Sequence, residues 1–237
     1  SLPELEVTFN SDGTISLKLI SQDTSARMIV AEMMILYNAL TAKFCIDHEI
    51  PVLFRTQPAP KEKLPLDDKG YLYYVFQQRR KLSPLQIQTT PAPHSGLGLS
   101  AYTHATSPIR RYLDLVAQRQ LKGFLSGEGP PLHEKDLESL RMVVEPALKN
   151  VAMIRRNRLR YWTLRFLGQH PGRPFKALVL DELKRKYRIV FTDFLMMAEL
   201  KRQDGIILKQ GQEIQVRIKK SDAWDNRLVL EYVDEPA

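Results

Sequence analysis

The segment Ala101–Leu115 (AYTHATSPIRRYLDL) holds the residues with the clearest capacity for chemistry. The pattern predicts a helix with Ser107 as its N-cap and Pro108 in its first turn. The first turn of a helix has amide groups without partners and the positive end of the helix dipole, so it favours acidic side chains. This turn instead carries Arg110 and Arg111. Two guanidinium groups placed there need a compensating anion, and a phosphate would be held by amides and planar side chains together.

A simpler interpretation needs no ligand. Asp114 follows one turn later and could pair with Arg110 or Arg111 on the same helix face. The two interpretations differ in the surroundings of Arg110. Phosphate binding requires that this side chain is not packed against carboxylates and that a nucleotide strand can reach it.

The positive charge of the chain is concentrated in one third of its length. The net charge is +8, with 35 Lys and Arg against 27 Asp and Glu. Residues 101–180 contain 14 of the basic and six of the acidic residues, a difference of +8, so the remainder is neutral. Such a concentration favours a surface that faces a polyanion. The alternative is a solvated helix face with bound counterions.

Composition limits the other classes of function. A hydrophobic content of 43% supports a packed core rather than disorder. No run of about 18 apolar residues is evident, so no membrane span is expected. The single cysteine, Cys45, cannot form an internal disulfide, which favours a reducing compartment, with the cytoplasm as the expected location. One Cys and five scattered His residues do not make a zinc site, and no metal ligands are assigned.

The elements that must position the arginines are mostly helical. A β-hairpin is expected over residues 5–20, because Asp12-Gly13 is a strong turn signal. Helices are expected over 25–48, 107–125, from about 134, and 146–168. Two apolar stripes predict that the 25–48 helix is mostly buried, so Glu32 and Asn38 within it need polar partners. Pro146 should either kink one long helix or start a new one.

From Arg173 onward, short β-rich runs replace the helical pattern. Five strands are expected, at 175–180, 187–191, 205–208, 213–218 and 227–232. Five short strands in about 60 residues suit a small OB-type barrel. The fold class is therefore α+β, mostly helical over residues 1–170 and ending in a five-stranded OB-type barrel over 171–237.

The arginine segment carries a family resemblance. The pattern Tyr102-x-His104-x-Thr106-Ser-Pro-Ile-Arg110-Arg111-Tyr-x-Asp-Leu, preceded by Gly96–Leu99, resembles the signature of the ribonuclease II / ribonuclease R (RNB) family of exoribonucleases. The same family is matched, in the same order, by residues 27–38 and by the Phe-Arg loop 50–58. The sequence most resembles the shorter cyanobacterial and plastid members. The resemblance identifies residues 1–170 with the C-terminal half of the RNB catalytic domain. Residues 211–218 and 227–230 resemble strands of the RNA-binding S1 domain, which usually follows it.

The resemblance implies roles for individual residues. Arg110 matches the catalytic arginine that contacts the phosphate at the reactive end, where it would neutralise charge in the transition state. Arg111 is the weaker match. Glu32 matches a glutamate near the 3′-terminal nucleotide, where it would accept hydrogen bonds from ribose hydroxyls. It could instead be a buried glutamate paired with Arg27 or another arginine. The same pocket is expected to be lined by Tyr102, His104 and Thr106.

Further RNA contacts are expected toward the C-terminus. Many family members carry a catalytic glutamate on the last helix, but this chain has no acid between Glu145 and Asp181. Arg156 and Arg160 on that helix are therefore expected to hold RNA phosphates. Tyr187 and Phe191 in the barrel are candidates to stack on bases. The alternative for the phenylalanine is the core of the barrel.

The resemblance implies an enzyme of which this chain is one part. The parent would be a processive 3′-5′ exoribonuclease that hydrolyses single-stranded RNA to nucleoside 5′-monophosphates, with Mg²⁺ as cofactor. The family's magnesium ligands are aspartates in the N-terminal half of the domain, and Asp67-Asp68, the only adjacent aspartates here, are expected to be solvated. The segment alone should therefore bind RNA without cutting it. Its missing half, separate or cleaved, is an expected partner and should leave a large apolar surface. The alternative is a non-catalytic RNA-binding protein that uses the Arg-rich helices and the barrel.

Overall fold

The computed structural model describes residues 2–65, 69–203 and 205–233. They form two compact units, each described here by itself. The barrel unit consists of residues 1–23, 64–80 and 152–237, and the helical unit of residues 24–63 and 81–151. The border expected at residues 170 and 171 from the family resemblance stays a prediction, and Asp67-Asp68 lie outside the described residues.

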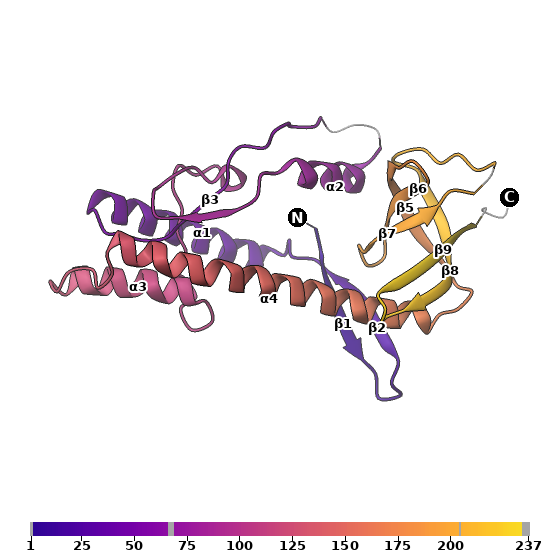
Figure 1. Ribbon diagram of the computed structural model, residues 1–237, viewed down its shortest axis with the longest axis horizontal. Coiled ribbons are helices and arrows are strands. Elements are labelled where there is room, and N and C mark those ends of the chain that lie inside the picture. The colour runs from indigo at the N-terminus through magenta and orange to yellow at the C-terminus, as the bar shows by residue number, and fades with distance from the viewer. Residues whose placement is uncertain (1, 66–68, 204, 234–237) are drawn as a thin grey trace. The chain divides into compact units, whose positions relative to one another are not determined.

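The barrel unit is built on one antiparallel five-stranded sheet. Its strand order is β7-β6-β5-β8-β9, and contacts between the edge strands β7 and β9 nearly close it (Figure 1). A bulge between Val179 and Asp181 shifts the register of β5 against β6 and helps the sheet to curl. The OB-like barrel and the mixed α and β composition agree with the predicted fold class. The strands are β5 (Pro174–Glu182), β6 (Lys186–Phe191), β7 (Met197–Lys201), β8 (Glu213–Asp222) and β9 (Arg227–Val233).

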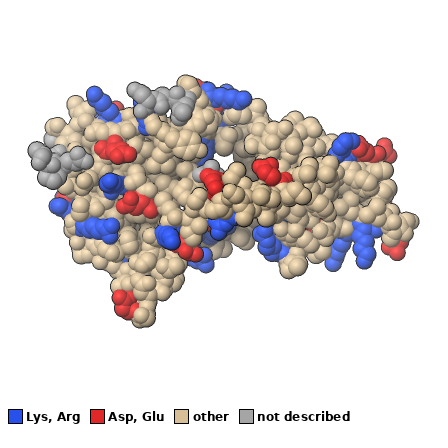
Figure 2. Space-filling view, turned by 180° about the vertical axis from the view of Figure 1, so that it is seen from behind, with Lys and Arg blue, Asp and Glu red and all other residues tan. Residues whose placement is uncertain are grey.

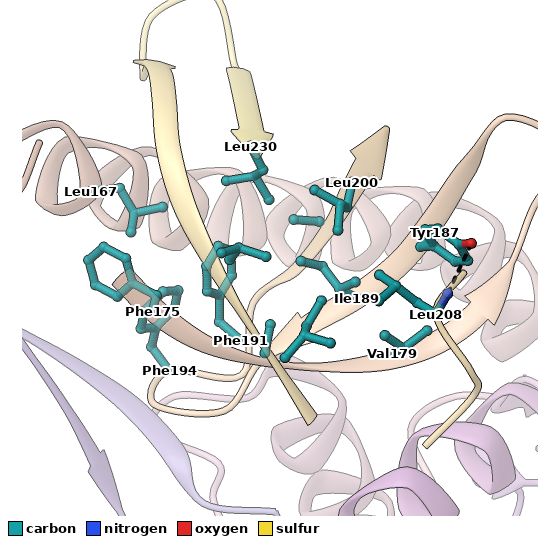
Figure 3. Packing of buried hydrophobic residues seen from close by; sticks show 14 of the residues in the cluster. Leu167, Phe175, Val179, Tyr187, Ile189, Phe191, Phe194, Leu200, Leu208 and Leu230 are labelled. Atoms are coloured by element: carbon teal, nitrogen blue, oxygen red, sulfur yellow. Dashed lines mark hydrogen bonds between the residues drawn. The ribbon is translucent and has the colours of Figure 1, made fainter. Parts of the chain in front are cut away.

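Three phenylalanines gather at one end of the barrel core, and aliphatic side chains surround a tyrosine at the other (Figure 3). The rings of Phe191 and Phe194 stack with their centroids 4.7 Å apart, and Phe175 meets both edge-on. At the other end, the Tyr187 hydroxyl accepts the backbone N–H of Leu208 at 3.2 Å. A buried hydroxyl with a partner carries little desolvation penalty, so this tyrosine fits an otherwise apolar core.

The third strand of the barrel lies elsewhere than predicted. Residues 205–208 form no strand: Gly205 has a φ of +82° and Ile207 is 83% exposed. Strand β7 occupies 197–201 instead, where Ala198 and Leu200 point into the core. The pleat explains the choice, because alternate residues of a half-buried strand must be apolar and Met197–Lys201 meets that condition.

The first segment of the chain is the expected hairpin. Strand β1 (Glu4–Phe9) pairs with β2 (Ile15–Ile20) in antiparallel register. Gly13 adopts a φ of +80°, and the Asp12 carboxylate accepts the backbone N–H of Thr14 at 2.9 Å. The turn chemistry that predicted the hairpin is therefore present in it.

Helix α2 (Tyr71–Lys81), for which the sequence pattern is ambiguous, packs on the outside of the barrel. Tyr73 lies against Leu178, Leu180 and Val190 in a small buried cluster. The Tyr73 hydroxyl donates to the side-chain oxygen of Gln210 at 3.0 Å. The outward-facing side of β5 is thereby covered, which explains why that strand is apolar on both faces.

Helix α4 (Glu134–Gly168) is one continuous helix of 35 residues with Pro146 inside it. The proline therefore neither ends the helix nor starts a second one. Arg141 bonds to Glu138 and to Glu145, the latter at 2.8 Å, so the turn before the proline has side-chain links along the helix axis. Such pairs contribute a few tenths of a kcal/mol each, a small offset to the lost backbone bond.

The helical unit joins α1 (Ser25–Asp47), the β-ladder of β3 (Phe54–Thr56) and β4 (Gln86–Gln88), a short 3-10 turn η1 (Ser95–Leu97), α3 (Tyr112–Leu125) and the first half of α4. One core cluster holds Ala42 and Cys45 of α1 with Val52 and Phe54. A second holds Leu53, Val116 and Leu137. Residues 50–54 contribute to both clusters, which fixes the backbone just before Arg55.

Helix α1 is exposed over most of its apolar surface, so the expectation of a mostly buried helix is wrong for this chain. Met33 and Ile29 are 62% and 65% exposed, and only four residues of the helix are buried. By length and composition alone the helix is apolar enough to cross a membrane, contrary to the expectation of no such segment. The buried helix of a globular core passes the same test, and Asn38 ties α1 to its own unit by hydrogen bonds to Tyr102 and Ala105.

The excess of positive charge is not gathered on one visible face. Figure 2 shows basic and acidic side chains interspersed over a largely uncharged surface. Several arginines from the basic third of the chain are already paired, among them Arg111 with Asp114 and Arg155 with Glu4. The cations that matter for an anionic ligand are therefore those that the structure leaves without a carboxylate.

Candidate phosphate-binding site

Helix α3 begins at Tyr112, five residues later than predicted, with Arg111 as its N-cap. Residues 107–110 form a separate turn, in which the backbone N–H groups of Arg110 and Arg111 donate to the Ser107 carbonyl at 3.3 and 3.0 Å. The Asp114 carboxylate causes this arrangement, because it accepts the N–H of Ser107 at 2.9 Å and so holds the turn in front of the helix. The two arginines consequently precede the helix, and Ser107 is not its cap.

Arg111 has its own carboxylate. Its Nε and Nη2 donate to Oδ2 of Asp114 at 3.0 and 2.7 Å, and Nη2 also donates to Oγ1 of Thr106 at 2.8 Å. Asp114 is fully buried. For Arg111 the simpler interpretation of the motif is thus correct: the pair orients the turn. Thr106, expected to line the pocket, acts here as an acceptor for this guanidinium.

Arg110 is exposed and lies against no carboxylate. Its single side-chain hydrogen bond to a described residue is a long one, from Nη2 to Oγ of Ser107 at 3.3 Å. A partly exposed guanidinium with four free N–H donors can turn toward an anion without losing an ion pair. The first condition that the phosphate interpretation sets, a guanidinium not packed against carboxylates, is therefore met.

Arg55 is a cation of the same site that the sequence analysis did not single out. Its backbone N–H donates to the Tyr102 carbonyl at 2.8 Å, which places β3 beside the arginine motif. The half-buried guanidinium has no hydrogen bond or ion pair within the part of the chain that the structure describes. Burial, and next the positive charge of Arg111, lower the pKa of Arg55, and Asp114 opposes them only in part. The one available signal in the sequence was its place in the Phe-Arg loop of the family resemblance.

His104 is neutral at pH 7 in this environment. Burial is the first cause that lowers its pKa, to about 4; the charges of Arg55 and Arg111 act in the same direction. The Asp114 carboxylate opposes them, but His104 Nδ1 and Asp114 Oδ1 are 4.0 Å apart. The desolvation and the two cations therefore outweigh the carboxylate. Burial likewise lowers the pKa of His94, so the positive charge of this site comes from arginine alone.

Tyr102 forms part of the wall of the site. It is buried, and its ring meets His94 and His104 edge-on, with centroids 5.5 and 5.4 Å away. Its hydroxyl accepts the side-chain N–H of Asn38, whose carbonyl oxygen accepts the backbone N–H of Ala105 at 2.9 Å. The partner predicted for Asn38 is thus found, and it fastens α1 to the arginine motif.

The remaining predicted RNA-binding residues fall into two groups. Glu32 is exposed on α1 and has no hydrogen bond or ion pair to another described residue, so the pairing with Arg27 is not observed. Arg156 is exposed on α4, whereas the guanidinium of Arg160 contacts Oδ1 of Asn226. Both belong to the barrel unit.

Tyr187 and Phe191 do not stack on bases in this conformation. They are 2% and 0% exposed, in the core of the barrel (Figure 3). The core alternative given for the phenylalanine is therefore the correct one, and it applies to the tyrosine as well. Strand alternation alone does not tell which face of a closing sheet becomes its interior.

The residues of the site do not fit a magnesium ion. Hard cations of this kind bind mainly through carboxylate and carbonyl oxygens. Over residues 2–65, 69–203 and 205–233, no three His, Cys, Asp or Glu side chains converge to hold a metal. The one carboxylate in the site, Asp114, is occupied by Arg111. The expectation that the magnesium ligands lie outside this chain stays a prediction.

Comparison with known proteins decides the family. The family model of the RNB domain matches residues 1–66 and 70–127, which include both the Phe-Arg loop and the arginine motif. The chain belongs to the RNB-domain family. The RNB chain is 36% identical over 190 residues to an uncharacterized ribonuclease of the cyanobacterium Synechocystis, covering 77% of this chain. It is 30% identical over 232 residues to the chloroplastic and mitochondrial ribonuclease II of Arabidopsis thaliana, covering 92% of this chain.

Solved structures share the fold of this RNB chain almost throughout. The Dss1 exoribonuclease of Candida glabrata, an active-site mutant, matches with a TM-score of 0.85 at 24% identity, over 98% of this chain and 32% of that one. The ribonuclease R of Mycoplasma genitalium in complex with double-stranded RNA matches with a TM-score of 0.77 at 18% identity, over 98% and 46%. The chain spans 28% of the length of each of the two curated relatives above.

Proposed function

We propose that this chain is part of a processive 3′-5′ exoribonuclease that hydrolyses single-stranded RNA to nucleoside 5′-monophosphates. Within it, Arg55 and Arg110 bind a phosphate of the RNA backbone. The observation that carries the proposal is the unpaired, half-buried guanidinium of Arg55 near Arg111, the residue that follows Arg110 in the chain. A buried charge without a partner is costly, and proteins keep such groups mainly where a ligand supplies the missing charge.

The arrangement supports different roles for the residues of the arginine motif. Arg110 is exposed and free of carboxylates, so it can form two hydrogen bonds to a phosphate and neutralise the charge that builds there. Arg111, held by Asp114 and Thr106, is a positioning residue that keeps the turn in place. Neutral His104 neither adds positive charge nor competes for the anion.

Glu32 would recognise ribose in this proposal. An exposed carboxylate without a protein partner can accept hydrogen bonds from a 2′-hydroxyl, the group that distinguishes RNA from DNA. Magnesium, which the family resemblance implies, would be held by aspartates outside the chain. The single, buried Cys45 supports a reducing compartment, for which we propose the cytoplasm.

The exposed apolar face of α1 would bind the N-terminal half of the RNB domain. Met33, Leu36 and Leu40, all more than half exposed, lie on this face. Contiguous apolar surface of this kind marks a site of protein contact. The chain spans only 28% of its curated relatives, which leaves ample sequence in such proteins for the missing half. A polypeptide with clustered aspartates that co-purifies with the chain would support this part.

The catalytic proposal is tested by Arg110→Ala in the full-length enzyme. Loss of a transition-state contact should lower the turnover of a labelled single strand by orders of magnitude and leave RNA affinity almost unchanged. Arg119→Ala is the matched control, since Arg119 is exposed on α3 outside the arginine motif. This variant should keep full activity. An unchanged rate for Arg110→Ala would remove this residue from the mechanism.

The same assay separates the enzyme from a non-catalytic RNA-binding protein. Both interpretations expect an affinity that falls as salt rises. Only the enzyme predicts Mg²⁺-dependent release of mononucleotides by the full-length protein. Binding without any degradation, under conditions in which the protein is folded, would favour the alternative.

A further inference from the structure

Trp224 is the most exposed large aromatic side chain among the described residues of the barrel unit. It is 88% exposed, in the turn between β8 and β9. The turn holds it there: the Asp222 carboxylate accepts the backbone N–H groups of Trp224 and Asp225, both at 3.0 Å, and Asn226 adopts a φ of +51°. The fold therefore presents an indole ring to solvent on a defined turn, although burial of that ring would stabilise the protein.

This turn lies across a groove from helix α4. Tyr161 and Trp224 both line a hollow of about 500 Å³ that Arg158 and Arg160 also border. The same two aromatic residues line a second hollow of about 450 Å³, bordered by Arg165. Both hollows lie within the barrel unit. Two aromatic rings thus stand between two openings, each with arginine at its rim.

A hydrogen bond and a row of aromatic contacts fix the two sides of the groove. The guanidinium of Arg160 contacts Oδ1 of Asn226, which links α4 to the turn. The ring of Tyr161 meets Trp162 edge-on with centroids 5.0 Å apart, and Trp162 in turn meets Phe9 at 4.7 Å. Tyr161 therefore stands at one end of a packed aromatic row, which sets its place before any ligand arrives.

The charges around the groove favour an anionic ligand. Arg158 and Arg165 are exposed and have no ion pair with a residue in the described part of the chain. Residues 146–180 contain eight Lys and Arg and no Asp or Glu. The carboxylates near the groove, Asp222 and Asp225, belong to the turn, and the first of them is engaged by backbone N–H groups.

We propose that this groove binds single-stranded RNA, with a base stacked on Trp224, a neighbouring base on Tyr161, and the phosphates between them on Arg158 and Arg165. Aromatic platforms lined by cations are the usual means of holding single strands without regard to sequence, because every base has a flat face. Helix α4 supplies half of this site, which the barrel alone could not form. The proposal rests on RNA as the substrate of the proposed function, and the groove would hold the strand away from the reacting phosphate.

Fluorescence of Trp224 tests the stacking directly. The chain has two tryptophans, so Trp162→Phe leaves Trp224 as the only one and keeps an aromatic ring against Phe9. Addition of a short oligoadenylate RNA should quench the emission of Trp224, whereas heparin, a polyanion without bases, should quench it little. Equal quenching by both ligands would overturn the proposal. Absence of quenching by RNA would also overturn it, and this is the result expected if another protein segment covers the ring.

Affinity measurements provide the second readout. Trp224→Ala should raise the Kd of the chain for the RNA by roughly 5- to 150-fold, the range for loss of one stacked base, and Trp224→Phe should restore most of the affinity. Ile207→Ala is the matched control, since Ile207 is equally exposed and borders neither hollow. Removal of an exposed side chain should not unfold the protein, which circular dichroism checks. An unchanged Kd for Trp224→Ala contradicts the proposal.

The groove and the catalytic arginine can fail independently. In the full-length enzyme, Trp224→Ala should weaken binding and leave the single-turnover rate at saturating RNA unchanged. Arg110→Ala should do the reverse. If Trp224→Ala binds RNA normally while Arg110→Ala is slow, the groove is refuted. If Arg110→Ala reacts at the normal rate while Trp224→Ala binds weakly, the role given to Arg110 is refuted.

Discussion

The titration of His104 offers a sharp test of the electrostatics around the arginine motif. Its pKa falls from 6.5 to about 4 because burial and the charges of Arg55 and Arg111 outweigh the attraction of Asp114. The charged groups that face it are these three and His94. If the balance were reversed, Asp114 would hold His104 protonated at neutral pH, and the site would carry a further positive charge.

The sign of the effect on stability follows from proton binding. Between pH 6.5 and pH 4 the unfolded chain binds a proton at His104 and the folded chain does not, so stability rises with pH through this window. The contribution of His104 is complete above pH 6.5 and is lost as the pH falls toward 4. The fall of the His104 pKa from 6.5 to about 4 corresponds to about 3 kcal/mol.

The assay combines NMR with chemical unfolding. The side-chain resonances of His104 should titrate near pH 4, and His104→Gln should remove about 3 kcal/mol of the pH dependence of the unfolding free energy between pH 7 and pH 4. His133→Gln is the control, since His133 is exposed, and it should keep the slope of the unmodified chain. A titration of His104 at or above pH 6.5, or equal slopes for both variants, would refute the reasoning.

Two further predictions concern packing in the helical unit. Asn38→Leu leaves the Ala105 N–H without an acceptor and the Tyr102 hydroxyl without its donor, so urea unfolding should show a loss of about 1–3 kcal/mol; a loss below 0.5 kcal/mol would mean that water replaces these bonds. Gly123→Ala would place a Cβ only 2.3 Å from the Gly129 carbonyl oxygen, so the cost of overpacking, about 1–3 kcal/mol, should exceed the gain of about 1 kcal/mol in helix propensity; a raised melting temperature would show that the loop moves away freely.

Local chemistry made part of the fold predictable. Asp12-Gly13 indicates a hairpin because few other residue pairs adopt its turn, and the apolar run after Ser25 indicates α1 to within one residue. The start of α3 was missed because an acceptor seven residues away, Asp114, captures the N–H of Ser107. No propensity at Ser107 itself carries that information.

The site was predictable only where the residues form a pattern. The Ser-Pro-Ile-Arg-Arg run indicates Arg110. Arg55 is a single arginine in a loop, and no sequence pattern around it indicates that it is half-buried without a partner. Tyr187 and Phe191 alternate as strand residues should, yet alternation fits either face of the sheet until the barrel closes. The apolar pattern of α1 predicted burial that its unit does not provide, because such a pattern does not tell where the covering surface lies.

The central claim is that Arg55 is kept unpaired in order to bind a phosphate. Its most direct test is the Kd of the chain for a nucleoside 5′-monophosphate, measured by calorimetry for the unmodified chain and for Arg55→Gln, with the unfolding free energy of each. Loss of a charge-assisted contact, worth about 1.5–3 kcal/mol, predicts an affinity at least tenfold lower. Removal of a buried, unpaired cation predicts an unfolding free energy that is unchanged or higher. Equal affinity combined with lower stability would show that Arg55 is a structural residue and would contradict the account.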